Sequence, residues 1–338
     1  MSVPISKKYN PSIDLLRIVS IFSVVLIHTS TKILEYYNYD LVNQTFTLFL
    51  NQAFRFAVPL FFFISAFVLE LNYPQDFNYF SYLKKRFSRL FLPYLFWSLI
   101  YYYFVYTINT KSFFTAFLLG DASYQLYFVP SLFIFYLVFP FLHRHIKFFA
   151  RKFILIFLLI VQLSLLSLDY YFQPLPFPHP VSVFLLNFNI FVLGILASHH
   201  QVKILDFVKK YQILFISVFL ILAGYITLEG RNLYLQNQNY LSFYSNWRPV
   251  NFIYTLVFSA LFFYIFSRFK HKTVFINKIA SYSFFVYLVH VIIIEITWIL
   301  IPHPFLSHPF FFLLATLIPS YLLAFLVSKI PHLSKITG

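Results

Sequence analysis

The sequence predicts an all-α protein, a polytopic membrane bundle of about ten transmembrane helices. The composition is 60% hydrophobic and only 10% charged, too few charges to coat a soluble domain of 338 residues. Apolar runs of roughly 20 residues, the length that crosses the hydrocarbon core of a bilayer, recur along the whole chain. We therefore expect residues 1–338 to form a single membrane domain.

The expected helices are the apolar runs between charged or proline-rich breaks. They cover residues 12–31, 46–71, 87–107, 124–142, 153–170, 181–198, 211–228, 249–267, 279–300 and 310–329. Lys7 and Lys8 before the first run resemble the start of a signal peptide. Arg17 and His28 within the run, and the absence of a small-residue cleavage site, favour a first spanning helix instead.

Positive charge is divided unevenly between the two sides of this predicted bundle. An even number of helices places both termini on one side, and the segments on that side hold nineteen of the 25 lysines and arginines. The opposite segments hold only Lys32, Lys111, Arg231 and Arg248. Because Lys and Arg in short loops resist translocation, we expect both termini in the cytosol. The formal charge of +15 then reflects topology, and it indicates contact with membrane lipids and no binding to nucleic acid.

Ionisable side chains inside the first predicted helix are candidates for chemistry. Arg17 and His28 are eleven positions apart, which places them on one face and about 16 Å apart along the axis. A charge near the hydrocarbon interior is costly, so such a residue indicates a functional site. The alternatives are that Arg17 reaches the headgroups beside Asp14 and that His28 is a hydrogen-bonded packing residue.

Three further arginines extend this set. Arg55 lies about 13 Å deep in the second predicted helix, in the outer half where His28 also lies, and a bundle salt bridge is the alternative to a catalytic role. Arg86 and Arg89 are three positions apart at the start of the third helix. That spacing suits the binding of phosphates, although anchoring at the cytosolic surface also explains it.

Several sequence blocks follow one another in a specific order. They are Arg17 and His28 with ten residues between them, Arg55 to Phe67, Arg86 and Arg89 followed by Leu92-Pro93-Tyr94, Leu126 to Pro130, and Ile279 to Ser283 through Tyr287 to His290. In this order, from residue 12 to about 295, the chain resembles the acyltransferase-3 family. Ala66, where that family usually has glycine, and Tyr127, where it often has tryptophan, are departures that concern local packing and the acceptor pocket.

The resemblance implies a transmembrane O-acyltransferase of the bacterial cytoplasmic (inner) membrane. Such an enzyme moves an acyl group, commonly acetyl, from cytosolic acetyl-CoA or another acyl-CoA to a hydroxyl of a cell-surface or lipid-linked carbohydrate. Fused relatives pass the acyl group to an outer esterase-like domain, which we expect this chain to lack. Direct transfer, a separate extracytoplasmic transferase or polysaccharide assembly machinery would then complete the reaction.

One mechanism assigns a role to each of these residues. Arg86 and Arg89 bind the CoA phosphates, Arg17 guides the donor into the bundle, and His28 deprotonates the sugar hydroxyl while Arg55 stabilises the oxyanion. The predicted catalytic residues are thus His28, Arg17 and Arg55, and the predicted donor-binding residues are Arg17, Arg86 and Arg89. An acyl-His intermediate is equally compatible with the sequence.

Four other residues are candidates for the cavity or the acceptor site. They are His290, Asp121, Gln125 and Tyr127, for which a core histidine and solvated helix ends are the alternatives. We predict no metal site, because the chain has no cysteine and its histidines do not cluster at metal-ligand spacing.

Two rival functions remain. A transporter or flippase for a glycan or small solute would also contain buried charges, but we find no inverted repeat and no paired glycine- or proline-broken helices. A non-catalytic scaffold or sensor in a polysaccharide assembly complex would tolerate the loss of His28.

Overall fold

The computed structural model describes residues 10–36, 41–73, 77–106, 111–172, 174–235, 245–269 and 274–330. Within these ranges the chain is helical and contains no strand. The helices are α1 (Pro11–Tyr36), α2 (Leu41–Ala53), α3 (Ala57–Asn72), α4 (Tyr79–Ile100), η1 (Tyr101–Val105), α5 (Phe113–Leu119), α6 (Phe128–Arg144), α7 (Ile146–Phe149), α8 (Lys152–Ser167), η2 (Leu168–Phe172), α9 (His179–His199), α10 (Gln201–Lys210), α11 (Gln212–Leu235), α13 (Pro249–Ser267), α14 (Val274–Leu300), α15 (His303–Leu306) and α16 (Pro309–Ser328).

The predicted fold class is confirmed. Eight helical segments of the described chain are long and apolar enough to cross a membrane. The other two expected spans are α4, which begins with basic residues, and the shorter apolar helix α6. The chain is a multi-pass α-helical membrane protein.

The second predicted span is interrupted where the sequence suggested one continuous helix over residues 46–71. Residues 54–56 form a turn between α2 and α3, and the amide of Arg55 bonds to the carbonyl of Gln52 at 3.2 Å. Pro59 explains the interruption, because proline has no N–H to offer the carbonyl of Arg55 and its ring clashes with that carbonyl. The predicted oxyanion-binding arginine therefore lies at a proline-linked helix break.

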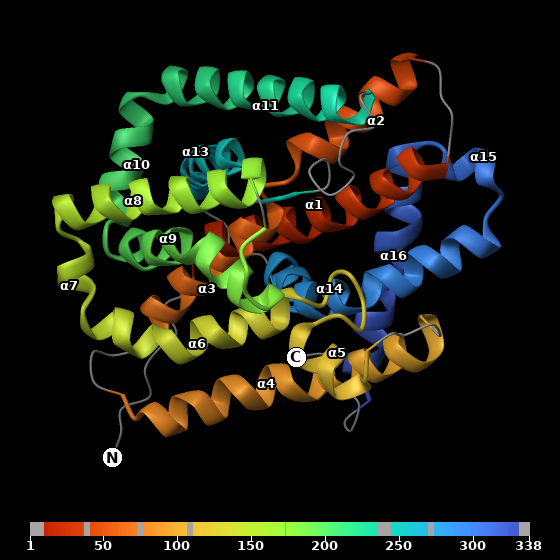
Figure 1. Ribbon diagram of the computed structural model, residues 1–338, viewed down its shortest axis with the longest axis horizontal. Helices are drawn as coiled ribbons and strands as arrows, with labels where there is room; N and C mark the ends of the chain where they lie inside the picture. The colour runs from red at the N-terminus through yellow and green to blue at the C-terminus, as the bar shows by residue number, and fades with distance from the viewer. Residues whose placement is uncertain are drawn as a thin grey trace.

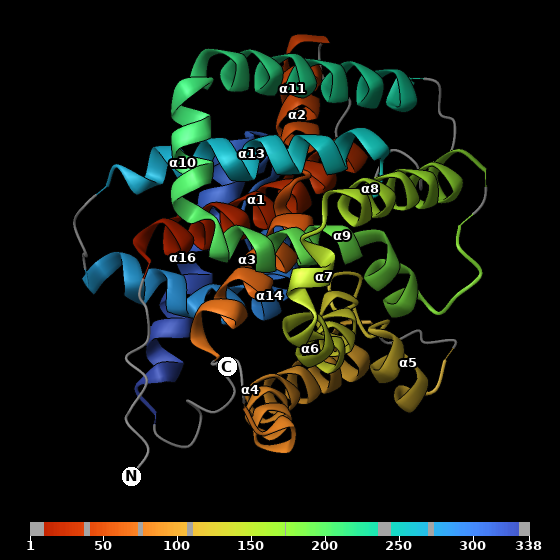
Figure 2. The ribbon, with the colours of Figure 1, turned by 90° about the vertical axis from the view of Figure 1, so that its left-hand side faces the viewer.

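α1 occupies the centre of the bundle. It packs against α2, α3, α13, α14 and α16, and Figures 1 and 2 both show it surrounded by these helices. Most of its length is buried, including Ser20, Ser23, Thr29 and Ser30. Each of these hydroxyls bonds to a carbonyl one turn earlier in α1, which allows polar side chains to lie in the interior. The helix that carries Arg17 and His28 is thus held from all sides.

α3 and α9 form the most extensive helix pair of the core. Their closest approach is at Gly194, where an added Cβ would lie 2.5 Å from the carbonyl oxygen of Phe63 and 2.9 Å from Cβ of Ala66. The small residue needed at this contact is supplied by α9.

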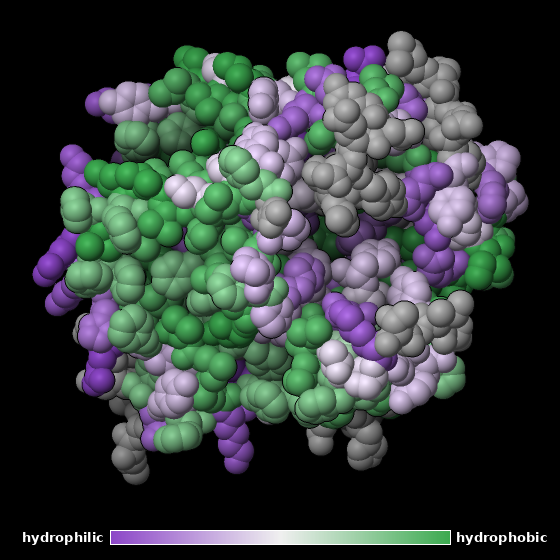
Figure 3. All heavy atoms as spheres, in the orientation of Figure 1, coloured by the Kyte–Doolittle hydropathy of each residue, from purple (hydrophilic) through white to green (hydrophobic). Residues whose placement is uncertain are grey.

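The surface has an apolar belt and more polar ends. α8 and α11 expose large aliphatic and aromatic side chains along their length, as a lipid-facing helix does. Figure 3 shows this apolar surface as a green band over α8 and α9, with hydrophilic side chains at the end where Figure 1 shows α7 and α10. α10 is an amphipathic helix that the sequence analysis treated as a loop, and its lysines belong to the predicted cytosolic set.

The two ends of the described chain lie at this same end of the bundle. Asn10 donates to Gln201 of α10 at 3.0 Å, and Tyr282, near the start of α14, bonds to Ser328 at the end of α16. This arrangement agrees with an even number of crossings.

Candidate active site

A cavity of about 250 Å³ lies between α1, α3, α4, α6 and α14. Arginines from α1 and α4 line it, together with Tyr136 of α6 and Tyr287 of α14. The three arginines are Arg17, Arg86 and Arg89, the residues predicted to bind the donor. Residues about 70 positions apart in the sequence thus line the same cavity.

The arginines of this cavity are held in different ways. Arg17 donates to Asp14 at 3.0 Å, and Asn277 of α14 donates to the other carboxylate oxygen at 3.1 Å. The guanidinium of Arg86 lies 5.0 Å from the ring centre of Tyr73, a cation–π contact. Arg89 is exposed. Arg17 therefore has a carboxylate partner, whereas Arg86 is held mainly by an aromatic face.

His28 lies beside a second histidine on α14. The ring centres of His28 and His290 are 5.3 Å apart, and the ring centre of Tyr124 is 4.9 Å from that of His28. Tyr287 connects this pair to the cavity, because it lines the cavity and its ring centre is 6.1 Å from that of His290. Two residues from the predicted set, His28 and His290, are thus neighbours, and Tyr124 is one that sequence reasoning missed.

Arg55 is buried in a network of side-chain amides on the outer side of His28. It donates to Asn51 at 2.6 Å, and Asn51 donates in turn to the carbonyl of Ile27 at 3.1 Å and to Thr31 at 2.9 Å. These two partners flank His28 in α1.

A second buried arginine, Arg248, extends this network. Its side chain is inaccessible to solvent and donates to Glu229 of α11 at 2.8 Å and to Gln52 at 2.5 Å. Gln52 donates to Asn51, so the network runs from α11 to α1. The sequence analysis assigned Arg248 to an outer loop. In the sequence, Arg248 directly precedes an apolar run. An arginine at such a position is buried only if it has a partner such as Glu229.

The secondary candidates are placed differently from one another. Gln125 is buried, and its backbone carbonyl accepts a hydrogen bond from the hydroxyl of Tyr287. This bond connects Gln125 to the histidine pair. Asp121 is exposed and forms an ion pair with Lys111 at 2.5 Å, away from any recorded contact with His28. Tyr127 packs on the ring of His179, with ring centres 4.8 Å apart.

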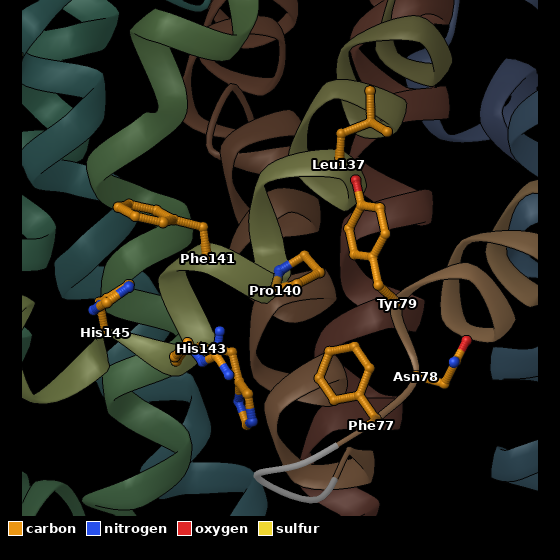
Figure 4. A pocket seen from close by; sticks show the side chains of 9 residues that line it. Phe77, Asn78, Tyr79, Leu137, Pro140, Phe141, His143 and His145 are labelled. Atoms are coloured by element: carbon orange, nitrogen blue, oxygen red, sulfur yellow. The ribbon is translucent and has the colours of Figure 1, made fainter.

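A larger cavity of about 720 Å³ opens at the predicted cytosolic end, where α4 begins and α6 ends. Figure 4 shows Tyr79, Pro140, Phe141 and His145 around it, and none of the predicted site residues lines it. Its wall includes His143, whose Nδ1 bonds to the buried carboxylate of Glu70 at 2.7 Å.

Glu70 is a buried acid that the sequence analysis did not single out. His143 and His199 each bond to one of its two oxygens at 2.7 Å, so the carboxylate joins α3 to α6 and α9. Within the described part of the chain, no group of three or more histidines, cysteines and acids is arranged to hold a metal ion.

The described helices thus form a multi-pass bundle with an arginine-lined cavity and, beyond Tyr287, a pair of histidines. A family model described as an acyltransferase domain matches residues 10–329. The chain belongs to the acyltransferase-3 family, which confirms the resemblance seen in the sequence.

The chain is also similar to curated proteins of staphylococci. It is 28% identical over 282 residues to a protein of Staphylococcus epidermidis named probable poly-β-1,6-N-acetyl-D-glucosamine export protein, a match that covers 79% of this chain and 72% of the relative. A protein of the same name from Staphylococcus aureus strain Mu50 is 27% identical over 310 residues, covering 86% and 83%. No solved structure matches the chain.

Proposed function

We propose that this protein transfers an acyl group, commonly acetyl, from cytosolic acyl-CoA to a hydroxyl of a carbohydrate at the outer face of the membrane. The observation that carries the proposal is the alignment of two sites through Tyr287. The arginine-lined cavity lies on the predicted cytosolic side of this residue, and the pair His28 and His290 lies beyond it.

The cavity suits an anionic donor with a narrow reactive arm. Nε of Arg86 is buried and has no partner within the described residues, so a donor phosphate would complete its hydrogen bonding. Arg89 is exposed at the mouth, where a phosphate on the surface can reach it. The rise between Arg17 and His28, about 16 Å, is comparable to the reach of a pantetheine arm.

His28 is the group at the reacting carbonyl in this proposal. It accepts either the hydroxyl proton of the sugar or the acyl group itself, and both chemistries suit a neutral imidazole. Arg55 and the amide network around it supply positive charge and hydrogen-bond donors on the outer side, where the oxyanion develops.

The acceptor is proposed to be an N-acetylhexosamine polymer. The relatives from staphylococci are named for poly-β-1,6-N-acetyl-D-glucosamine, which makes a β-1,6-linked N-acetylglucosamine oligosaccharide the first acceptor to test. A separate outer transferase or polysaccharide assembly machinery are the further partners we propose.

Export of that glycan is the second candidate function, favoured by the names of the relatives and by the helix break at residues 54–56. The two functions differ in whether they require an acyl donor. An exporter needs no acyl donor, whereas a transferase cannot act without one.

The experiment is a transfer assay with purified protein, radiolabelled acetyl-CoA and the β-1,6-linked oligosaccharide. We expect wild type to label the sugar and His28→Ala to lose about 100- to 10,000-fold of that rate, the usual contribution of a positioned acid–base group. His145→Ala, which removes an exposed cytosolic histidine, is the matched control and should be unchanged.

Unimpaired transfer by His28→Ala would remove this residue from the chemistry. Absence of label from the sugar in wild type, together with passage of the oligosaccharide across proteoliposomes, would favour export.

A further inference from the structure

His290 has one ring nitrogen fully engaged and the other without a partner. Its Nδ1 lies 2.8 Å from the carbonyl oxygen of Tyr287 and 3.2 Å from that of Val286. A carbonyl oxygen only accepts, so Nδ1 must carry the proton and Nε2 must carry the lone pair. Nε2 is buried and no described residue bonds to it.

A buried lone pair of this kind is costly unless a ligand satisfies it. The ring of His28 is in contact with that of His290, with ring centres 5.3 Å apart, so a group bonded to one imidazole lies beside the other. Nδ1 is bonded back to the backbone of α14, so Nε2 lies at the opposite edge of the ring.

The turn of α14 that carries His290 is fixed by a second helix. The hydroxyl of Tyr101 donates to the carbonyl of Leu288 at 2.9 Å and accepts from the amide of Ile292 at 3.1 Å. These are the two backbone groups that pair with each other in an ordinary α-helix. Tyr101 is fully buried, so the backbone on both sides of His290 is held in place by η1.

His28 has no comparable support. It is half-buried, its recorded neighbours are the rings of Tyr124 and His290, and no hydrogen bond to it is found within the described residues. A general base needs a fixed tautomer, which a hydrogen bond to its other nitrogen provides. Of the two histidines, His290 has that arrangement.

We propose that His290 is a second catalytic residue: its Nε2 accepts the proton of the attacking sugar hydroxyl, while His28 carries the acyl group. This inference rests on the proposed function and decides between the two chemistries left open there.

The transfer proceeds in two half-reactions. A neutral His28 nitrogen forms a bond to the thioester carbon, the carbon–sulfur bond breaks, and the proton of the second His28 nitrogen goes to the thiolate, giving acyl-His28 and CoA thiol. The sugar oxygen then bonds to the acyl carbon as its proton moves to Nε2 of His290. The bond to His28 breaks, His28 recovers a proton from His290, and both histidines end neutral.

The test separates the two half-reactions. His290→Asn keeps an amide N–H where Nδ1 donates but has no group at Nε2, so it retains the local hydrogen bond and removes the base. Purified wild type, His290→Asn and His28→Asn are loaded with radiolabelled acetyl-CoA, freed of excess donor and then given the β-1,6-linked N-acetylglucosamine oligosaccharide. Label on the protein and on the sugar is followed with time.

We expect wild type to take up label and to discharge it to the sugar. His290→Asn should take up label normally and discharge it at least 100-fold more slowly, and His28→Asn should take up none. Discharge by folded His290→Asn within threefold of wild type would overturn the inference, and so would failure of that folded variant to take up label. Labelled sugar formed by wild type without any labelled protein would also overturn it.

Two further outcomes complete the design. If His290→Asn does not fold, His290→Ala with added imidazole replaces it, and restored discharge supports the base role whereas a folded variant without rescue opposes it. If wild type takes no label and forms no product, the proposed function itself fails.

Discussion

At the scale of single residues, the cavity arginines differ in how much of their bonding the protein supplies. Arg17 has Asp14 as a partner, whereas buried Nε of Arg86 is left for a ligand. A lost charge-assisted hydrogen bond costs about 1.5–3 kcal/mol, so we expect Arg86→Ala to raise the KM for acetyl-CoA roughly 10- to 100-fold with little change in kcat.

The control for that measurement is Lys84→Ala, which removes an exposed cation of the same helix that does not line the cavity. An equal rise of KM in both variants would indicate general attraction of the anionic donor and no specific site.

The ion pair between buried Arg248 and half-buried Glu229 makes a second prediction at this scale. Removing one partner leaves an unpaired charge and costs up to roughly 3–5 kcal/mol, the range for a fully buried pair, so Arg248→Met should lower the Tm in detergent. Arg248→Met combined with Glu229→Gln should recover much of that loss, because the stranded carboxylate is gone. A double variant no more stable than the single one would argue against the pairing.

Single residues also show what the sequence could and could not predict. The grouping of Arg17, Arg86 and Arg89 around one cavity agrees with the expectation from sequence, because charged side chains within or beside apolar runs are unusual. The roles of these arginines and of His28 stay predictions. The burial of Arg248 was not predictable, since it depends on Glu229, which lies in a different helix. The tautomer of His290 likewise depends on backbone carbonyls that only coordinates reveal.

At the scale of helices, apolar length predicted the spans but not their breaks. The interruption at residues 54–56 follows from Pro59, a local signal that was present in the sequence and outweighed by the apolar residues around it. α10 was missed because a short amphipathic helix at the membrane surface lacks the length of a spanning segment.

The contact between α3 and α9 makes a prediction at this scale. Gly194→Ala would place a methyl group 2.5 Å from the Phe63 carbonyl oxygen, and forcing the two helices apart should cost about 1–3 kcal/mol of stability. Gly224→Ala is the matched control, because nothing lies within 4 Å of the added Cβ in α11. We expect it to be neutral or stabilising by up to about 1 kcal/mol, as alanine favours a helix. Equal Tm values for the two variants would contradict the close contact.

At the scale of the whole molecule, the orientation rests on the distribution of Lys and Arg. The chain has no cysteine, so single cysteines report position without background. In intact spheroplasts an impermeant maleimide should label Lys111→Cys, whereas Lys203→Cys in α10 should react only after permeabilisation, and both positions are exposed. The reverse pattern would invert the proposed direction of transfer.

The central claim is that acyl groups cross the bundle from the arginine-lined cavity to the histidine pair. The most direct measurement uses proteoliposomes with protein in one selected orientation, radiolabelled acetyl-CoA on the side of Arg86 and the β-1,6-linked N-acetylglucosamine oligosaccharide on the other. We expect labelled sugar only when acetyl-CoA is on the side of Arg86 and the oligosaccharide on the other side, and none with His28→Ala. Label that appears only when donor and sugar share one side, or equally without His28, would contradict it.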